Sequence, residues 1–194
     1  MTRTLVLFAK VPQPGRVKTR LAAEIGPIAA LWWYRHQVAR LVRRVGHDPR
    51  WRTVLAVSPD LDGVTSPLLP GGVTRWPQGY GDLGQRMARA LRLAPGPVLV
   101  VGSDIPGVTS AHIARAFRVL NGHDAVLGPA SDGGYWLIGL ARGSRAPAGL
   151  FQDVRWSGPH AMADTVKSLH PLRIGYADEL RDVDTAADLR AAQL

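Results

Sequence analysis

Apolar runs alternate with stretches of helical periodicity along the whole chain. Continuous apolar runs bounded by turn residues are typical of buried parallel strands. Such runs predict strands at 4–10, 52–58, 97–104, 124–130, 135–141 and 173–177. Apolar residues at helical spacing predict helices at 27–45, 82–93, 110–120 and 159–169, and Thr185 opens a final helix with a capping box to Asp188.

The predicted helix 27–45 indicates which of its faces is buried. Its apolar residues follow one helical stripe, which we expect to face the core. The stripe consists of Ile28, Leu31, Trp32, Val38, Leu41, Val42 and Val45.

The order of the elements predicts the fold class. Strands that alternate with helices favour a mainly parallel sheet with helices on both faces, an α/β Rossmann-like arrangement. The turn residues Ser131 to Gly134, between two apolar runs, add an antiparallel hairpin and make the sheet mixed. A chain of 194 residues predicts a single domain over 1–194. In such sheets ligands bind beyond the carboxyl ends of the strands.

Composition excludes several classes of protein. The chain has no cysteine, which excludes disulfides and thiolate metal sites, and no apolar stretch of membrane-spanning length. The net charge of +9 comes from 21 arginines and three lysines that are scattered rather than clustered, so we do not expect a nucleic-acid partner. We expect a cytoplasmic protein without a membrane partner. Nothing in the sequence indicates the oligomeric state.

Candidate chemistry begins with the loop FAKVPQPGRVKTRL (8–21), which follows the first strand. Two of the three lysines lie in it, although the chain otherwise uses arginine. A glycine that exposes backbone amides, with cations around it, is suited to hold phosphate oxygens. The alternative is a surface turn with solvated charges. The phosphate-binding candidates of this loop are Lys10, Gly15, Arg16, Lys18 and Arg20.

Asp104 follows the most apolar strand and precedes Pro106. A carboxylate at the mouth of a buried strand can hold Mg²⁺ or Mn²⁺, which prefer oxygen ligands and bridge to substrate phosphates. The alternative is an aspartate that caps backbone amides in a turn. We expect the metal role.

Five motifs in this order resemble one family. They are FAKVPQPGRVKTRL, GYGDLGQRM (79–87), VGSDIPGVT (101–109), LGPASDGGYWLIGL (127–140) and RDVDTAADL (181–189). Together they resemble the radical-SAM/selenodomain-associated transferase family, often labelled as an arsenosugar-biosynthesis glycosyltransferase. The resemblance covers nearly the whole chain and implies the nucleotide-diphospho-sugar transferase superfamily, the glycosyltransferase-A fold.

The resemblance implies roles for particular residues. The cations of the opening loop look like those that hold a triphosphate in related nucleotidyltransferases. Asp184 resembles the aspartate that completes the metal site with Asp104, although it could instead favour the start of the last helix; Asp182 is its substitute. Glycosyltransferases of the superfamily usually carry Asp-x-Asp where this chain has Gly-Ser-Asp104. That departure favours the nucleotidyltransferase branch.

Two further segments are candidates for substrate contacts. Amides near a helix start could bind a base or a phosphate, so Gly81, Gln85 and Arg86 are nucleotide-binding candidates. The hairpin segment supplies candidates on the acceptor side, and at most one of Tyr135 and Trp136 should face the pocket. These acceptor-side candidates are Asp132, Gly133, Gly134 and Tyr135.

The sequence therefore predicts a transferase that depends on Mg²⁺ or Mn²⁺ and uses a nucleotide-activated substrate. The preferred reaction is nucleotidyl transfer from a nucleoside triphosphate to a small anionic acceptor, with release of pyrophosphate, and Lys18 and Asp104 are the catalytic candidates. One alternative is glycosyl transfer from a nucleotide sugar. Another is a nucleotide- or nucleic-acid-binding module without turnover. Because exposed charges contribute little to folding, replacing Lys18 or Arg20 with alanine should weaken nucleotide binding and hardly change stability.

Overall fold

The structure is a computed structural model and describes residues 2–192. Its strands are β1 (Thr4–Lys10), β2 (Arg52–Ser58), β3 (Thr74–Pro77), β4 (Val98–Gly102), β5 (Ala125–Pro129), β6 (Tyr135–Leu140) and β7 (Ile174–Tyr176). Its α-helices are α1 (Thr19–Ile25), α2 (Pro27–Val45), α3 (Asp60–Thr65), α4 (Leu83–Leu93), α5 (Ser110–Leu120), α6 (Ala161–Ser168) and α7 (Ala186–Ala191). A short 3₁₀ turn, η1 (Gly143–Arg145), follows β6.

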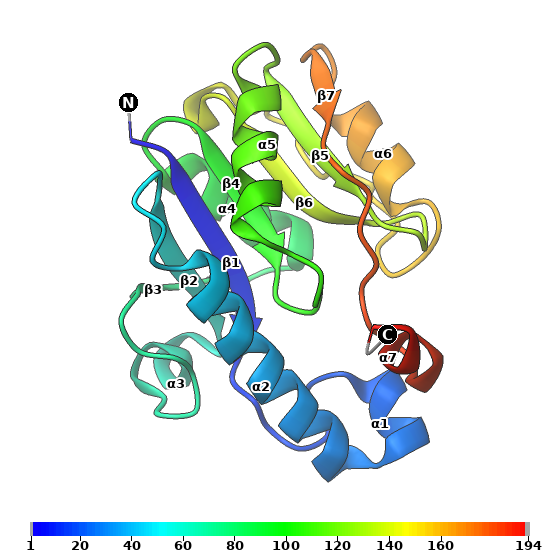
Figure 1. The fold of residues 1–194 in the computed structure, drawn as a ribbon. Coiled ribbons are helices and arrows are strands. Elements are labelled where there is room, and N and C mark those ends of the chain that lie inside the picture. Colours follow the sequence, from blue (N-terminus) through cyan, green and yellow to red (C-terminus); the bar gives the residue numbers. More distant parts are fainter. Residues whose placement is uncertain (1, 193–194) are drawn as a thin grey trace.

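The strands form one seven-stranded sheet in the order β3-β2-β1-β4-β6-β5-β7 (Figure 1). β1 pairs in parallel with both β2 and β4, whereas β6 runs antiparallel to β4 and β5. This confirms the predicted α/β class with a mainly parallel, mixed sheet. It also confirms the hairpin, whose pairing has an irregularity at Gly128 and Pro129.

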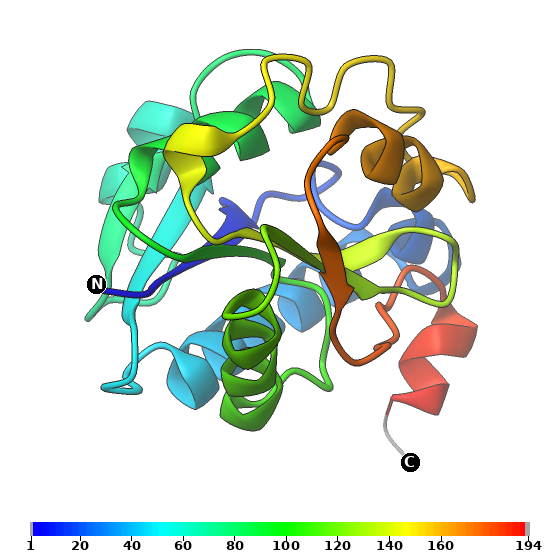
Figure 2. The same cartoon turned by 90° about the horizontal axis from the view of Figure 1, so that it is seen from above.

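Helices cover both faces of the sheet (Figure 2). Leu5 and Leu7 of β1 point to the face covered by α2 and α5, and Val6 between them points to the face covered by α4 and α6. Strand geometry causes this alternation, and the two helical layers explain why the strand is apolar at every position. Each fully buried leucine or valine stabilises the fold by about 1.5–3 kcal/mol.

Three short elements lie in stretches that the sequence pattern left as loops. α3 has six residues and β3 has four, too few for a periodic signal. α1 starts after Lys18, whose backbone is in the left-handed region at φ 47°, and no side chain caps it. Its start therefore lacks the sequence signature of a helix N-terminus.

The predicted stripe of α2 is wrong at its amino-terminal end. Ile28 and Trp32 are more than half exposed, whereas Ala30 and Tyr34 are buried. The first turns of α2 pack against Leu21 of α1 and against α7 instead of the sheet. Because the first turns of α2 contact α1 and α7, a different face of α2 is buried there, and Tyr34 lies at the end of β1.

Candidate active site

Tyr34 joins the carboxyl ends of β1 and β4. Its hydroxyl accepts a hydrogen bond from the backbone N–H of Lys10 at 2.8 Å and lies 3.1 Å from Oγ of Ser103. Burial raises the pKa of Tyr34, so the hydroxyl stays protonated and can serve as both donor and acceptor. The two strand ends are thus fixed beside each other, where ligands bind in parallel sheets.

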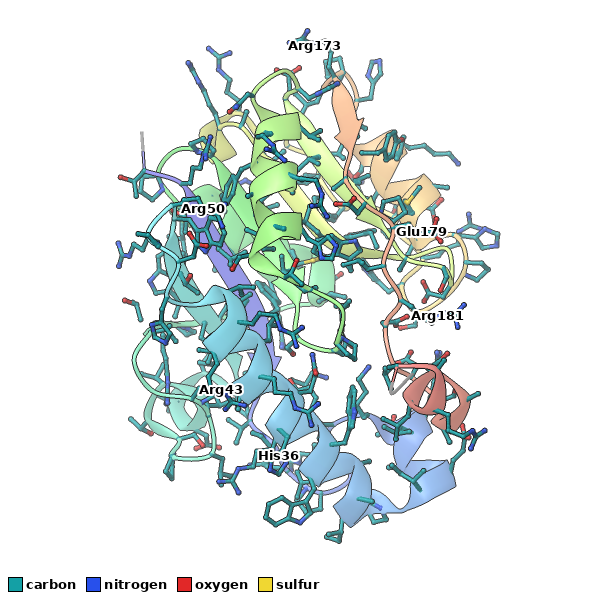
Figure 3. The ribbon with its side chains drawn as sticks, in the orientation of Figure 1. His36, Arg43, Arg50, Arg173, Glu179 and Arg181 are labelled. Carbon is teal, nitrogen blue, oxygen red and sulfur yellow. The ribbon has the colours of Figure 1, made fainter. Side chains whose placement is uncertain are left out.

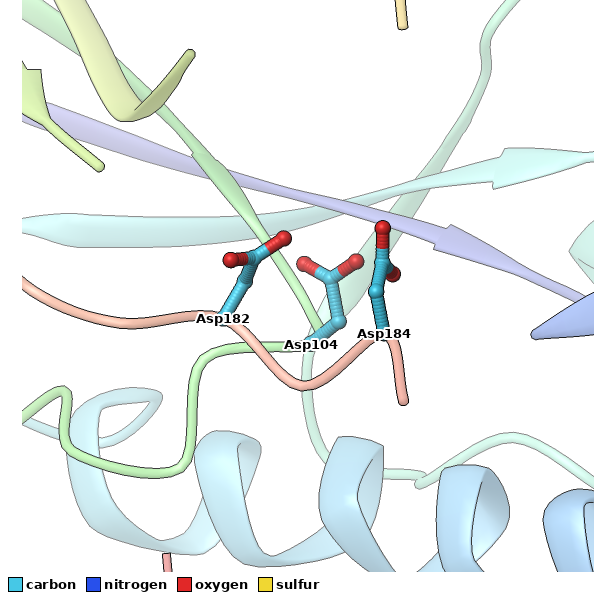
Figure 4. A group of neighbouring side chains, drawn as sticks. All are labelled: Asp104, Asp182 and Asp184. Carbon is cyan, nitrogen blue, oxygen red and sulfur yellow. The ribbon is translucent and has the colours of Figure 1, made fainter. Parts of the chain in front are cut away.

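Three carboxylates meet at this edge. Asp104 follows β4, while Asp182 and Asp184 belong to the segment before α7, and the backbone N–H of Val183 donates to the carbonyl of Asp104 at 3.3 Å. One oxygen from each carboxylate lies within 4.8 Å of the others. In Figure 4 the three side chains point in the same direction from the two segments that carry them. Asp104 and Asp184 therefore lie together, as the predicted shared metal site would require.

Lys18 lies between two of these carboxylates. Its Nζ is 2.7 Å from Oδ2 of Asp104 and 2.7 Å from Oδ1 of Asp184. Its side chain is only 7% exposed, which excludes the alternative of a solvated charge and corrects the expectation that Lys18 is an exposed cation. Burial alone would lower the pKa of Lys18, but the two aspartates outweigh burial and raise it. Lys18 is therefore a charged ammonium.

Asp182 has the opposite electrostatic environment. Burial raises its pKa to about 6, and the neighbouring charges of Asp104, Asp132 and Asp184 add to that rise. Lys18 opposes the rise but does not cancel it. The cluster thus holds more negative charge than the nearby cation neutralises.

These side chains line a cleft of about 540 Å³. Its lining combines charged groups, namely Lys10, Lys18 and the aspartates, with apolar and aromatic side chains. Clefts of about 300–1,000 Å³ with a few polar groups are typical of small-molecule sites. The apolar and aromatic part of the lining includes Phe8, Leu83, Met87, Val100, Tyr135, Ile138 and Trp156.

The cleft contains many of the residues predicted from the sequence, though not all. The predicted residues that line it are Lys10, Lys18, Arg20, Asp104, Asp132, Gly134, Tyr135, Asp182 and Asp184. Those outside its lining are Gly15, Arg16, Gly81, Gln85, Arg86 and Gly133. Tyr135 packs with the cluster on the α4 and α6 face of the sheet, whereas Trp136 packs with the cluster on the α2 and α5 face and donates from Nε1 to the carbonyl of Asp178, so the two side chains point to opposite faces, as predicted.

Two of the residues outside the lining have contacts that explain their place. Oε1 of Gln85 accepts from the backbone N–H of Asp82 and completes the capping box of α4. Arg86 donates from Nε to the carbonyl of Gly81 at 2.8 Å and from Nη1 to Oγ of Ser58 at 3.2 Å. These bonds order the loop beside the cleft, and a direct contact of either residue with a ligand stays a prediction.

Two residues of the cleft escaped the sequence patterns. Gln78 is buried, and its Nε2 donates to the carbonyls of Ala9 and Ala56. Tyr34 was hidden because the predicted stripe of α2 ran along another face. A buried glutamine directly after a short edge strand gives no periodic signal, so only the fold could place it.

The remaining charge is spread over the surface. The arginines labelled in Figure 3 come from α2 (Arg43), from the turn before β2 (Arg50), from the position just before β7 (Arg173) and from the segment after β7 (Arg181). They lie on separate parts of the molecule, as the scattered sequence positions predicted. Among residues 2–192, no helix combines the length and apolar character needed to cross a membrane.

Comparison with known proteins places transferases among the structures similar to this chain. Residues 41–158 match the family of uncharacterised proteins conserved in bacteria (DUF2064). The crystal structure of a candidate nucleotide-diphospho-sugar transferase from Desulfovibrio desulfuricans G20 is 30% identical and has a TM-score of 0.88. That match covers 98% of this chain and 86% of the other. No curated protein matches the chain.

More distant structures share the fold. CMP:2-keto-3-deoxy-manno-octonic acid synthetase, solved in complex with CTP, has a TM-score of 0.60 at 11% identity, over 100% of this chain and 97% of the other. Rv0371c from Mycobacterium tuberculosis H37Rv, solved in complex with manganese, has a TM-score of 0.56 at 20% identity, over 99% and 97%. The structural neighbours thus include a protein assigned as a nucleotide-diphospho-sugar transferase and a nucleotidyltransferase. No comparison indicates a radical-SAM or arsenosugar association, which stays a prediction.

Proposed function

Because the chain belongs to the bacterial family DUF2064, and because its cleft combines clustered carboxylates with a buried ammonium, we propose that it is a metal-dependent transferase that uses a nucleotide-activated substrate. The preferred reaction is nucleotidyl transfer from a nucleoside triphosphate to a small anionic acceptor, with release of pyrophosphate. The observation that carries the proposal is the meeting of Asp104, Asp184 and Lys18 at the carboxyl ends of parallel strands.

The donor set fits a hard divalent cation. Oxygens of Asp104, Asp182 and Asp184 lie within 4.8 Å of one another, and carboxylate oxygens are the ligands that Mg²⁺ and Mn²⁺ prefer. We assign Asp104 and Asp184 as the metal ligands, with Asp182 as the third carboxylate. When bound, the ion would neutralise charge that develops on the phosphates during transfer.

The chain's own groups would bind and orient the nucleotide. Lys10 and Arg20 lie in the cleft with Lys18, where their charges can contact phosphate oxygens. The apolar and aromatic part of the lining can hold the flat face of a base or the acceptor away from water. Such positioning, with charges already in place, is the main source of catalysis in phosphoryl and nucleotidyl transfer.

The single carboxylate at the end of β4 favours nucleotidyl transfer over glycosyl transfer. β4 leads into Gly102-Ser103-Asp104, so this segment supplies one carboxylate, and Ser103 is buried and bonded to Tyr34. The second carboxylate comes from the segment before α7, as in the nucleotidyltransferase pattern. Glycosyl transfer from a nucleotide sugar remains the second candidate, because it is supported by the likeness to the Desulfovibrio desulfuricans protein.

A thermal-shift screen tests the proposal. The purified chain is heated with nucleoside triphosphates and nucleotide sugars, each with and without Mg²⁺ or Mn²⁺. A ligand that binds the folded state raises the melting temperature by mass action, so we expect one nucleotide to stand out, with metal only.

Product analysis then separates the reactions. With a panel of small anionic acceptors, pyrophosphate supports nucleotidyl transfer and a nucleoside diphosphate supports glycosyl transfer. Binding of oligonucleotides that weakens steeply with salt, with no metal-dependent product, would instead identify a binding module.

A further inference from the structure

The ammonium of Lys18 contacts both of the carboxylates that we assign as metal ligands, Asp104 and Asp184. Its Nζ is 2.7 Å from one oxygen of Asp104 and 2.7 Å from one oxygen of Asp184, and the side chain is 7% exposed. No other lysine or arginine within residues 2–192 bridges two carboxylates of the cleft. The ammonium thus sits where a cation shared by Asp104 and Asp184 belongs.

A divalent cation and this ammonium exclude each other from those oxygens. Mg²⁺ binds carboxylate oxygens at about 2.0–2.1 Å, so an ion shared by the two oxygens that Lys18 contacts would lie in the space that Nζ holds between them. A metal bound to the same two oxygens would lie in contact with Nζ, where the repulsion between like charges is strong. One cation has to leave when the other arrives.

The backbone around Lys18 lets its side chain move without the loop. Val17 before it and Leu21 after it are buried in hydrophobic clusters, so the chain is anchored on both sides. The four-carbon stem of a lysine carries a compact charge on rotatable bonds. Rotation of that stem is enough to take the ammonium off the carboxylates.

The balance of charge favours exchange. Three carboxylates, Asp104, Asp182 and Asp184, face one buried ammonium, and Arg20 adds a contact of 3.4 Å to Asp184 from a largely exposed position. One ammonium therefore leaves the cluster negative, and a doubly charged ion neutralises it better. Arginine, the common cation of this chain, would hold such carboxylates through a rigid fork, whereas lysine holds them as a point charge.

We propose that Lys18 is an exchangeable counter-ion, which holds Asp104 and Asp184 together until a divalent cation takes its place and then turns toward the phosphates of the nucleotide. This inference rests on the proposed function, because it assumes the metal site described above. It adds an order of events: the metal binds first, and its arrival supplies the lysine that helps to bind the nucleotide. Metal and nucleotide then bind cooperatively through one side chain.

Lysine-selective NMR tests the exchange on the unaltered protein. The chain has only three lysines, Lys10, Lys18 and Lys167, so labelling lysine with ¹³C at Cε and ¹⁵N at Nζ gives three signals. Lys10→Arg and Lys167→Arg variants each remove one signal, which assigns that of Lys18 without changing it. Mg²⁺ is then titrated without nucleotide, and calorimetry follows its binding in parallel.

We expect the Lys18 signal to move to the position of a free lysine as Mg²⁺ saturates the site, while the Lys167 signal stays unchanged. Saturable Mg²⁺ binding with an unmoved Lys18 signal would overturn the exchange and leave the metal site intact. No Mg²⁺ binding at millimolar concentrations without nucleotide would overturn the exchange and its order of events, and the thermal-shift screen with nucleotide present would then decide the metal-dependent function. The titration and the thermal-shift screen together thus separate failure of the exchange from failure of the proposed function.

Competition also predicts a change in metal affinity. Lys18→Met keeps the length of the stem and removes the charge, so Mn²⁺ should bind about tenfold more tightly, measured by electron paramagnetic resonance without nucleotide. Lys167→Met is the matched control, because Lys167 is 78% exposed and lies outside the cleft, and its Mn²⁺ affinity should equal that of the unaltered chain. Equal affinities of all three proteins would overturn the competition.

Discussion

Two groups of aspartates in this protein have opposite electrostatic environments. Asp164 of α6 accepts from Nε of Arg155 at 2.8 Å and from Nη2 at 3.0 Å, and these bonds lower its pKa to about 2. Asp182 in the cleft makes no comparable pair, and burial with its acidic neighbours raises its pKa to about 6. The residue type is the same, and the shifts have opposite signs.

The difference teaches how to separate structural from functional carboxylates. Next to Asp164, the positive charge of the Arg155 guanidinium balances the negative charge of the carboxylate. The pair joins the start of α6 to the segment before it. In the cleft, carboxylates outnumber buried cations, and such an imbalance costs free energy unless a ligand compensates it. Groups with perturbed pKa values in a cleft are therefore candidates for function.

The largest expected effect comes from substitutions that remove one negative charge from each of the two groups of aspartates. Asp104→Asn keeps the size of the side chain but loses a metal ligand, so metal-dependent stabilisation by nucleotide should disappear and turnover should fall about 100-fold or more. Asp164→Asn is the control and should retain both. Thermal shift and steady-state kinetics measure the two quantities. Unaltered metal response and turnover in Asp104→Asn would refute the metal role of Asp104.

A smaller effect concerns the cations of the cleft. Lys18→Ala leaves two carboxylates without their shared donor, and because these are about a third exposed we expect a loss of about 1–2 kcal/mol in the free energy of unfolding. Arg20 is 63% exposed, so Arg20→Ala should cost less than about 0.5 kcal/mol. Urea denaturation in EDTA measures both. Equal losses in the two variants would mean that the buried position of Lys18 adds nothing to the free energy of unfolding.

A further pair of effects consists of pH dependences of opposite sign, measured by thermal unfolding in EDTA. The folded pKa of Asp182, about 6, lies above the value of about 3.9 in unfolded chains, so its contribution to stability is present below pH 4 and lost as pH rises toward 6. The folded pKa of Asp164, about 2, lies below that value, so its contribution is present above pH 4 and lost as pH falls toward 2.

Single substitutions isolate each slope. Asp182→Asn should remove the decline in melting temperature between pH 4 and pH 6, and Asp164→Asn should remove the decline between pH 4 and pH 2. If both variants changed the same pH range in the same direction, the contrast between the two groups would fail.

The amino-acid sequence by itself determined the strands, the main helices and the position of Asp104. Apolar runs such as 97–104 cannot lie at a surface, and their alternation with amphipathic helices leaves few topologies other than a parallel sheet. Capping residues such as Thr109 and Thr185 mark helix starts through local hydrogen bonds. Local patterns were sufficient wherever the physical cause was local or periodic.

Tertiary structure alone decided the state of the charges. Nothing near Lys18 in the sequence shows that its ammonium is buried between Asp104 and Asp184, which lie 86 and 166 residues away. The same holds for Tyr34, which turns inward because α1 and α7 cover the first turns of α2. Burial and charge balance depend on every segment that packs around a group. They are therefore set by the folded molecule as a whole, and the local sequence carries no signal for them.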